Sequence, residues 1–271
     1  MKIWTVDAFT DKTFAGNPAA VTIVEEFPSD EMCQKIAAEM NLSETAFIKP
    51  LGSSHFHIRW FTPEVEVKLC GHATLASAHI LFEEGIVKEE GITFDSLSGP
   101  LFVTKESKDI ILDFPLQKTG EVLPLHLFKK LFKREAIVNA VKAYDDVIVE
   151  LVDETLIREL KLDPSRIKEI DCRTLIVTAK GNPPYDCVSR IYAPQEGINE
   201  DPVTGSAHCL LVDYWQQKLG KSEFLAYQAS PRGGILGLQI VGDRVHLRGQ
   251  AVTILEGTLK RLPYKSKDFL E

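Results

Sequence analysis

The sequence has little that would direct the chain to a membrane, to nucleic acid or to an oxidising compartment. No apolar stretch approaches the roughly 18–20 residues of a membrane-spanning helix, and Asp7 interrupts the apolar start before a signal sequence could form. The 39 Asp and Glu outnumber the 31 Lys and Arg, with no local basic cluster, which disfavours nucleic acid and anionic membranes as partners. The five cysteines are odd in number and lack framework spacing, so we expect reduced thiols in a cytoplasmic protein.

Motifs for metal ions and nucleotide cofactors are also missing. Cys-x-x-Cys, His-x-x-x-His, His-Glu-x-x-His and an acid-rich calcium loop do not occur. The glycine-rich fingerprints of dinucleotide and P-loop nucleotide sites do not occur either. The sequence therefore predicts chemistry that needs no metal and no cofactor.

What is present indicates a soluble globular protein with an internal repeat. Its 271 residues are 44% hydrophobic and 26% charged, which is ordinary for a globular chain long enough for two domains. Residues 59–63 (Arg-Trp-Phe-Thr-Pro) resemble 190–194 (Arg-Ile-Tyr-Ala-Pro), and the segment after Gly71 resembles that after Gly205. The distance from Gly71 to Ser96 is 25 positions, as is that from Gly205 to Ser230. A softer match places residues 43–48 opposite 172–177.

From these matches we predict two copies of one α/β unit, over residues 1–117 and 118–271. The C-terminal strand could return to the first copy, and the alternative is one domain with an accidental likeness. A helix is expected over 29–40, and two largely apolar helices are expected from Gly71 and from Gly205, ending at Gly85 and Gly220. Short apolar or alternating runs predict the strands, which are 2–9, 19–24, 44–49, 56–61, 92–95, 101–104, 110–114, 174–179, 187–192, 224–228, 235–241, 244–247 and 251–255.

The two glycine-led helices suggest a binding site. The first turn of a helix has unpaired N–H groups, and the small residues after Gly71 and Gly205 would let a ligand approach those donors. With the helix dipole, such a start suits a carboxylate or an oxyanion. Two related copies would point both starts at one cleft, although either glycine alone could be a turn residue.

Polar residues with catalytic potential lie close to these starts. His72 follows the first glycine, while Asp201 and Ser206 flank the second. Glu44 is an acid at the start of an otherwise apolar strand, where burial would raise its pKa toward the range needed for acid/base catalysis. Each could instead have a structural role, such as capping a strand or holding a turn.

At these residues the chain resembles the phenazine-biosynthesis isomerase (PhzF-like) family, within the diaminopimelate epimerase and proline racemase superfamily. The matching segments span nearly the whole chain, and the most specific are Leu-Cys-Gly-His-Ala-Thr over 69–74 and Glu-Asp-Pro-Val-Thr-Gly-Ser-Ala-His over 200–208. The others are residues 6–10, 14–21, 41–47, 61–63 and 228–234.

The resemblance implies an α+β fold of two pseudo-symmetric halves, each a mostly antiparallel sheet curled around a central helix, and often a homodimer. It also implies cofactor-free isomerisation, with the acid/base glutamate at Glu44 and the pocket histidine, aspartate and serine at His72, Asp201 and Ser206. By the same resemblance Gly71 and Gly205 match the region that binds the substrate carboxylate, and Asn17 and Gln228 match polar positions near the cleft.

The leading hypothesis is an isomerase that moves a proton within a small carboxylate-bearing substrate bound between the halves. The superfamily's racemases use two thiols; Cys70 occupies the first position, but residues 201–203, expected to hold the second, contain no cysteine. Two alternatives stay open, namely a protein that binds a metabolite or a partner without catalysis, and a racemase or epimerase that uses Cys70.

Overall fold

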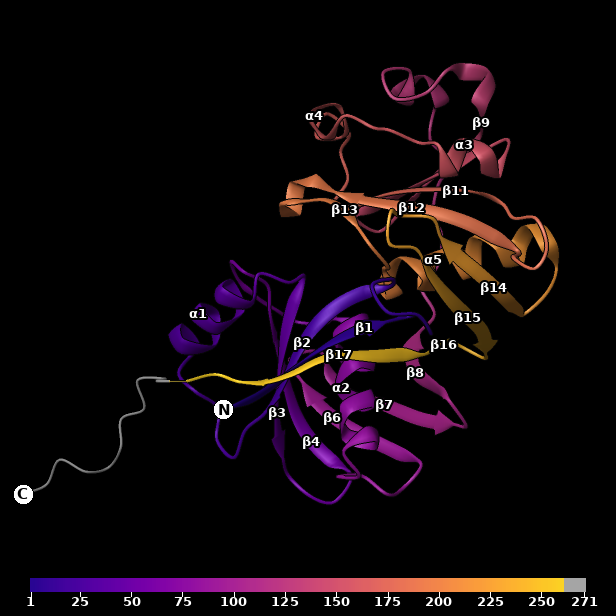
Figure 1. Ribbon diagram of the computed structural model, residues 1–271. Coiled ribbons are helices and arrows are strands. Elements are labelled where there is room, and N and C mark those ends of the chain that lie inside the picture. Colours follow the sequence, from indigo (N-terminus) through magenta and orange to yellow (C-terminus); the bar gives the residue numbers. More distant parts are fainter. Residues whose placement is uncertain (261–271) are drawn as a thin grey trace, which may run out of the picture.

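The protein consists of two lobes built largely from strands, each with one long helix inside its sheet (Figure 1). The computed structural model describes residues 1–260. Over these residues the strands are of mixed direction and the helices are few, which is an α+β arrangement. No helix of this described part is long and apolar enough to cross a bilayer.

The first lobe comprises the N-terminal strands and two helices. Helix α1 (Asp30–Met40) lies on the outside of the sheet, and helix α2 (Gly71–Glu83) lies inside it (Figure 1). The strands are β1 (Lys2–Ala8), β2 (Asn17–Ile23), β3 (Glu44–Pro50), β4 (His55–Phe61), β5 (Glu66–Val67), β6 (Gly91–Ser96), β7 (Gly99–Glu106) and β8 (Asp109–Pro115).

The second lobe has the same kind of construction around helix α5 (Gly205–Leu219). Its short helices are η1 (Leu125–Phe128), η2 (Arg134–Ala136), α3 (Glu154–Arg158), α4 (Pro164–Ile167) and η3 (Pro194–Glu196). Its strands are β9 (Ile137–Ala143), β10 (Asp146–Leu151), β11 (Leu175–Lys180), β12 (Cys187–Ala193), β13 (Ile198–Asp201), β14 (Glu223–Gln228), β15 (Gly234–Val241) and β16 (Arg244–Gly249), and the last strand of the chain is β17 (Ala251–Thr258).

The order of strand pairings is the same in both lobes. In the first, β2 and β3 are parallel, β3 and β4 antiparallel, β4 and β6 parallel, and β6, β7 and β8 antiparallel. In the second, β10 and β11 are parallel, β11 and β12 antiparallel, β12 and β14 parallel, and β14, β15 and β16 antiparallel. Strand β16 also pairs with β8, so the backbone hydrogen bonds continue from one lobe into the other.

Two further segments connect the lobes. Strand β17 pairs antiparallel with β1 of the first lobe. The segment that follows β8 bonds to β9 of the second lobe, where the Gly120 N–H donates to the Lys142 carbonyl at 2.7 Å and the Leu123 N–H to the Ala140 carbonyl at 2.8 Å. The lobes are therefore joined by two crossing segments as well as by the β8–β16 pair.

The long helices are apolar because strands surround them. In α2 the residues from His72 to Ala78 are all buried, and in α5 those from Ala207 to Trp215 are all buried. The predicted helix starts at Gly71 and Gly205 are confirmed, as is the helix over 30–40, where the Ser29 hydroxyl accepts from the Met32 N–H at 3.3 Å.

Two parts of the sequence comparison need correction. Thr45 pairs with Phe61 and Leu175 with Tyr192, so Thr174, and not Arg173, occupies the position of Glu44. The equal spacings of 25 do not mark equivalent residues either, since β6 ends at Ser96 but β14 ends before the loop that holds Ser230. The strand ends differ because α5 is two residues longer than α2 while the connection after it is four residues shorter, which places the end of β14, Gln228, 23 positions after Gly205.

Four strands were not predicted, namely the short β5 and β13 and the hairpin of β9 and β10. The residues of β9 and β10 alternate or are apolar as strands should, but the turn between them, at Tyr144 and Asp145, has none of the glycine or asparagine that marks a tight hairpin. Tyr144 adopts the left-handed conformation at φ 55° without that signal. The other predicted strands are present, with ends shifted by up to three residues.

Candidate active site

A cavity of about 490 Å³ lies between the lobes, where the two long helices begin. A Cβ placed on Gly71 would lie 3.6 Å from the Gly205 Cα, so the first turns of α2 and α5 are in contact. Both turns line the cavity. The positive ends of two helix dipoles therefore converge here, which favours an anionic ligand.

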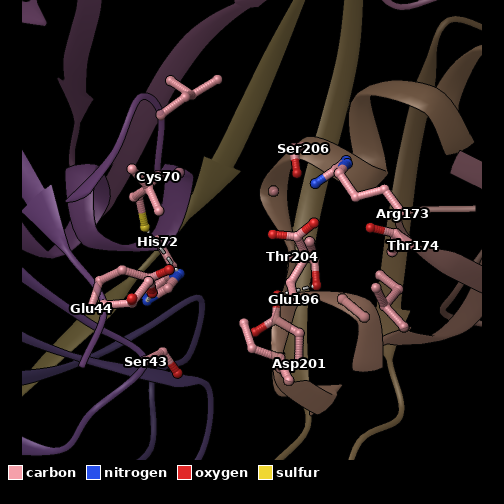
Figure 2. Close-up of a pocket in the computed structure, with 18 of the residues that line it drawn as sticks. Ser43, Glu44, Cys70, His72, Arg173, Thr174, Glu196, Asp201, Thr204 and Ser206 are labelled. Atoms are coloured by element: carbon pink, nitrogen blue, oxygen red, sulfur yellow. Dashed lines mark hydrogen bonds and ion pairs between the residues drawn. The ribbon is translucent and has the colours of Figure 1, made fainter. Parts of the chain in front are cut away.

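One wall of the cavity carries a carboxylate, an imidazole and a thiol. Figure 2 shows Glu44, His72 and Cys70 together on the side of the first lobe. Glu44 begins β3, His72 is the second residue of α2, and Cys70 is the residue before that helix. Glu44 Oε2 lies 3.0 Å from His72 Nε2, and Cys70 Sγ lies 3.5 Å from His72 Nδ1.

The contact between Glu44 and His72 leaves both groups able to bind a ligand. Their Oε2 and Nε2 atoms are close enough for an ion pair, but they are not aligned for a hydrogen bond with each other or with another group of the described residues. Both side chains are nearly buried, at 12% and 7% exposure. Buried polar atoms are normally hydrogen-bonded, so this pair is suited to receive a polar group of a substrate.

The surroundings of His72 and Cys70 also shift the pKa values of their side chains. Burial opposes a charged imidazole, but Cys70 and the Glu44 carboxylate outweigh it and raise the pKa of His72 above its usual value. Burial raises the pKa of the Cys70 thiol to about 11. At neutral pH this thiol is uncharged, so the Glu44 carboxylate is the group on this wall that favours a protonated His72.

Asn17, at the start of β2, connects this wall to the other lobe. Its Nδ2 donates to Asp201 Oδ1 at 2.8 Å and to the Val203 carbonyl at 2.9 Å, and lies 3.2 Å from His72 Nδ1. Its Oδ1 accepts from the Ser43 hydroxyl at 3.1 Å. Since an amide nitrogen has only two hydrogens, the two shorter contacts account for them.

Asp201 lies on the opposite wall, at the end of β13 (Figure 2). The Thr204 hydroxyl donates to its Oδ2, while Asn17 donates to its Oδ1. Burial nevertheless raises the pKa of Asp201 to about 6, against the opposing effect of His72. A carboxyl with this pKa can hold or release a proton near neutrality.

The structure brings Glu44, His72, Asp201, Gly71, Gly205 and Ser206 to one cavity. It places Asn17 and Gln228 behind the wall, fully buried. Gln228 Oε1 accepts from the Thr204 N–H at 2.8 Å and its Nε2 donates to the Asp201 carbonyl at 2.6 Å. Both residues therefore support the loop that carries Asp201.

Other lining residues were not singled out from the sequence. Thr204 precedes α5 as Cys70 precedes α2, so the position equivalent to the first thiol is Thr204 and not a residue of 201–203. Thr174 and Arg173 line the second wall at the positions of Glu44 and Ser43. The sequence repeat indicated the segments that contain these residues, but only the structure showed which residue occupies which position.

The wall of the first lobe offers three possible metal-ligand atoms, from Glu44, Cys70 and His72, within 4.8 Å of one another. The thiol faces Nδ1 of the imidazole, whereas the carboxylate faces Nε2. An ion on either ring nitrogen would have only one of the other two groups beside that nitrogen. The arrangement fits a proton relay better than a three-ligand metal site.

Comparison with known proteins relates the chain to one family over most of its length. The model of the PhzC-PhzF family, described as phenazine biosynthesis-like protein, matches residues 6–257. A Halalkalibacterium halodurans protein named as an uncharacterized isomerase is 49% identical over 95% of this chain and 97% of its own.

Solved structures of other proteins have a similar fold. A phenazine biosynthesis protein of the PhzF family from Enterococcus faecalis has a TM-score of 0.87 at 43% identity, covering 94% of this chain and 97% of that one. A probable proline racemase from Agrobacterium radiobacter has a TM-score of 0.61 at 10% identity, over 97% of this chain and 94% of that one. The second likeness concerns the fold alone.

Proposed function

This chain belongs to the phenazine biosynthesis-like family, and from that premise we propose that it is an isomerase. Its substrate is a small molecule with a carboxylate, bound between the lobes, and the reaction moves a proton from one carbon to another. The observation that carries the proposal is the Glu44–His72 pair, 3.0 Å apart and facing the cavity beside two helix starts.

In the proposed mechanism the N–H groups at the starts of α2 and α5 hold the substrate carboxylate. The Glu44 carboxylate takes a proton from a substrate carbon, and the electron pair left behind is delocalised over the adjacent unsaturated system. The protonated His72 donates a hydrogen bond to a polar substituent where charge develops. Asp201 orients the polar substituents, and it donates a hydrogen bond only in its protonated form. Glu44 then returns the proton to a second carbon, so that no electrons are gained or lost overall.

The difference between the two walls supports a single base. Thr174, which occupies the position of Glu44 in the second lobe, cannot act as a carboxylate. Thr204, at the position of Cys70, has no thiol, and the pKa of Cys70 itself is raised to about 11. A racemase needs a base on each face of the substrate. The carboxyl of the second wall, Asp201, already accepts hydrogen bonds at both oxygens, from Asn17 and Thr204, so these residues favour proton movement on one face.

The repeated pairing order further supports duplication of one unit, and we propose residues 1–117 and 118–271 as its two copies. The fold class and the family are consistent with this history. Homodimer formation, cytoplasmic location and independence from cofactors stay predictions.

The experiment that tests the proposal uses turnover in deuterium oxide. A carboxylate panel is first screened by thermal shift, and stabilising compounds are incubated with the protein and followed by NMR for product and for deuterium at carbon. We expect Glu44→Gln to lower the rate by about 10²-fold or more, the usual scale of general acid/base catalysis. Glu64→Gln, at an exposed carboxylate on the rim of the same cavity, is the control.

Two outcomes would contradict the proposal. Turnover by Glu44→Gln at the wild-type rate would remove the assigned base, and binding of ligands without any conversion would favour the binding protein instead. Cys70→Ala separates the remaining alternative, because it should barely affect the proposed isomerase but abolish a racemase that depends on this thiol.

A further inference from the structure

The wall opposite Glu44 carries one strongly basic side chain. Arg173 lines the cavity just before β11, and no other Lys or Arg among residues 1–260 does so. The remaining charged groups of the lining are mostly acids, including Glu44, Glu64 and Asp201. In a chain with a formal charge of −8, this guanidinium adds a permanent positive charge to the helix starts and His72 that an acidic ligand would meet inside the cavity.

The Arg173 side chain is held in place but keeps donors to spare. Its Nη2 donates to Asp146 Oδ2 at 2.6 Å, and Asp146, the first residue of β10, is only 6% exposed in its side chain. The Nε and Nη1 atoms of Arg173 have no acceptor within residues 1–260, and the side chain is 46% exposed. A guanidinium fixed at one edge presents the other edge to a carboxylate.

The strand register explains why this charge exists on one wall only. Arg173 occupies the position that Ser43 has in the first lobe, next to the position of Glu44. Figure 2 shows Arg173 and Ser206 on the second wall and Glu44 and His72 on the first. The cavity is therefore polarised, with the acid/base pair on one side and a cation beside the start of α5 on the other.

We propose that Arg173 is a specificity-determining residue that binds the substrate carboxylate together with Ser206 and the first turn of α5. This inference rests on the proposed function and refines it, because it orients the substrate. The acid group lies on the second wall, and the carbons that exchange the proton lie toward Glu44. The substrate class is a small carboxylic acid whose reacting carbons extend from its acid end across the cavity.

The test measures binding of matched acids and amides to the full chain. Benzoate is compared with benzamide, and succinate with succinamide, by isothermal titration, and inorganic phosphate is titrated as a different anion. For at least one pair the wild type should bind the acid about tenfold or more tightly than the amide, as expected from a charged hydrogen bond. Arg173→Met should abolish this preference, and Arg173→Lys should retain part of it.

Controls separate recognition from folding and from catalysis. Arg166→Met removes an exposed guanidinium of α4 outside the cavity lining and should keep the preference. Because Arg173→Met leaves Asp146 buried without its partner, the double variant with Asp146→Asn is measured beside it. Glu44→Gln should keep the preference for acids, so loss of the anion subsite and loss of the base give different results.

Three results would overturn the inference. The wild type could prefer neither acid to its amide, or Arg173→Met could keep the full preference. Binding of phosphate that depends on Arg173, without binding of the acids, would exclude carboxylate as its ligand.

Discussion

At the scale of residues, the site depends on a buried amide that touches both lobes. Asn17 is completely buried and bonds to Asp201, Val203 and Ser43. No residue of the first lobe other than Asn17 donates to the Asp201 carboxylate within the described chain. The position of Asp201 relative to Glu44 therefore depends on a side chain that need not contact the substrate.

Asn17→Ala should lower the free energy of unfolding by about 1–3 kcal/mol, since buried acceptors lose their donor. It should also lower kcat, because Asp201 loses its fixed position. Urea unfolding and steady-state kinetics measure the two effects. Asn199→Ala, at an exposed position outside the cavity lining, should change stability by less than about 0.5 kcal/mol. An unaltered free energy of unfolding in Asn17→Ala would show that these hydrogen bonds do not hold the lobes together.

The raised pKa of Asp201, about 6, should make stability depend on pH. The folded state binds this proton more tightly than the unfolded chain, where the pKa is near 4, so the stabilisation is complete below about pH 4 and is lost as pH rises through about 6. Between these limits the free energy of unfolding of the wild type should fall by up to about 3 kcal/mol relative to that of Asp201→Asn. The fall is smaller where the folded carboxyl is open to the cavity.

The measurement is the difference in unfolding free energy between the two proteins in urea at a series of pH values. Taking the difference cancels groups that titrate alike in both. If the difference stays constant between pH 4 and 7, Asp201 is not held in a protonating environment.

At the scale of elements, the first turns of α2 and α5 carry the anion-binding potential. Neither Gly71 nor Gly205 has a positive φ, so their backbone does not require glycine. A Cβ on Gly71 would make ordinary contacts, 3.6 Å from the Gly205 Cα and 3.9 Å from Phe114. Packing therefore tolerates a methyl group at Gly71, where it would lie against the first residue of α5 and the Phe114 ring.

Gly71→Ala should accordingly keep the free energy of unfolding within about 1 kcal/mol of the wild type. Its affinity for carboxylates should fall, because the methyl group stands between the two helix starts that we propose to bind the acid. Gly249→Ala is the contrasting variant, since its Cβ would lie 2.5 Å from the Phe9 ring, and overpacking should cost about 1–3 kcal/mol. Thermal unfolding and titration with benzoate measure both variants. Undiminished carboxylate binding by Gly71→Ala would place the anion elsewhere.

At the scale of the whole molecule, the return of the last strand makes the first lobe dependent on the second half of the chain. Strand β17 comes from the end of the chain but pairs with β1 through seven register positions of the first lobe. The Leu259 N–H also donates to the Met1 carbonyl at 2.9 Å, so the start of β1 lies beside the end of β17. Removing residues 118–271 therefore takes a strand from the first lobe.

Residues 1–117 alone should therefore not form a stable fold, because β1 would become an unpaired edge over an apolar core. A fusion that places residues 250–260 ahead of Met1 through a short linker restores that strand and should unfold cooperatively. Near-ultraviolet circular dichroism and urea unfolding compare the two fragments. A cooperative transition in the fragment without β17 would show that the first lobe folds without this strand.

Much of the local structure could be predicted because periodicity and helix signals act over a few residues. The strands of the first half other than β5, the N-cap at Ser29 and the two apolar helices all follow from such patterns. The hairpin of β9 and β10 was missed because its turn at Tyr144 lacks the usual residues. The equivalence of Thr174 with Glu44 was missed by one position because similarity between short segments does not contain the strand register.

By itself the sequence determined which residues were available for chemistry and that two glycine-led apolar helices had to be enclosed by strands, since both properties lie in short segments. Only the tertiary structure decided that Asn17 would join His72 to Asp201, that Gln228 would lie behind the cavity and that Arg173 would face it. These outcomes depend on strand register and on contacts between segments more than 150 positions apart, such as that of Asn17 with Asp201. A one-residue shift in register turns a side chain from the cavity to the opposite face of a sheet, and residue order alone does not record that shift.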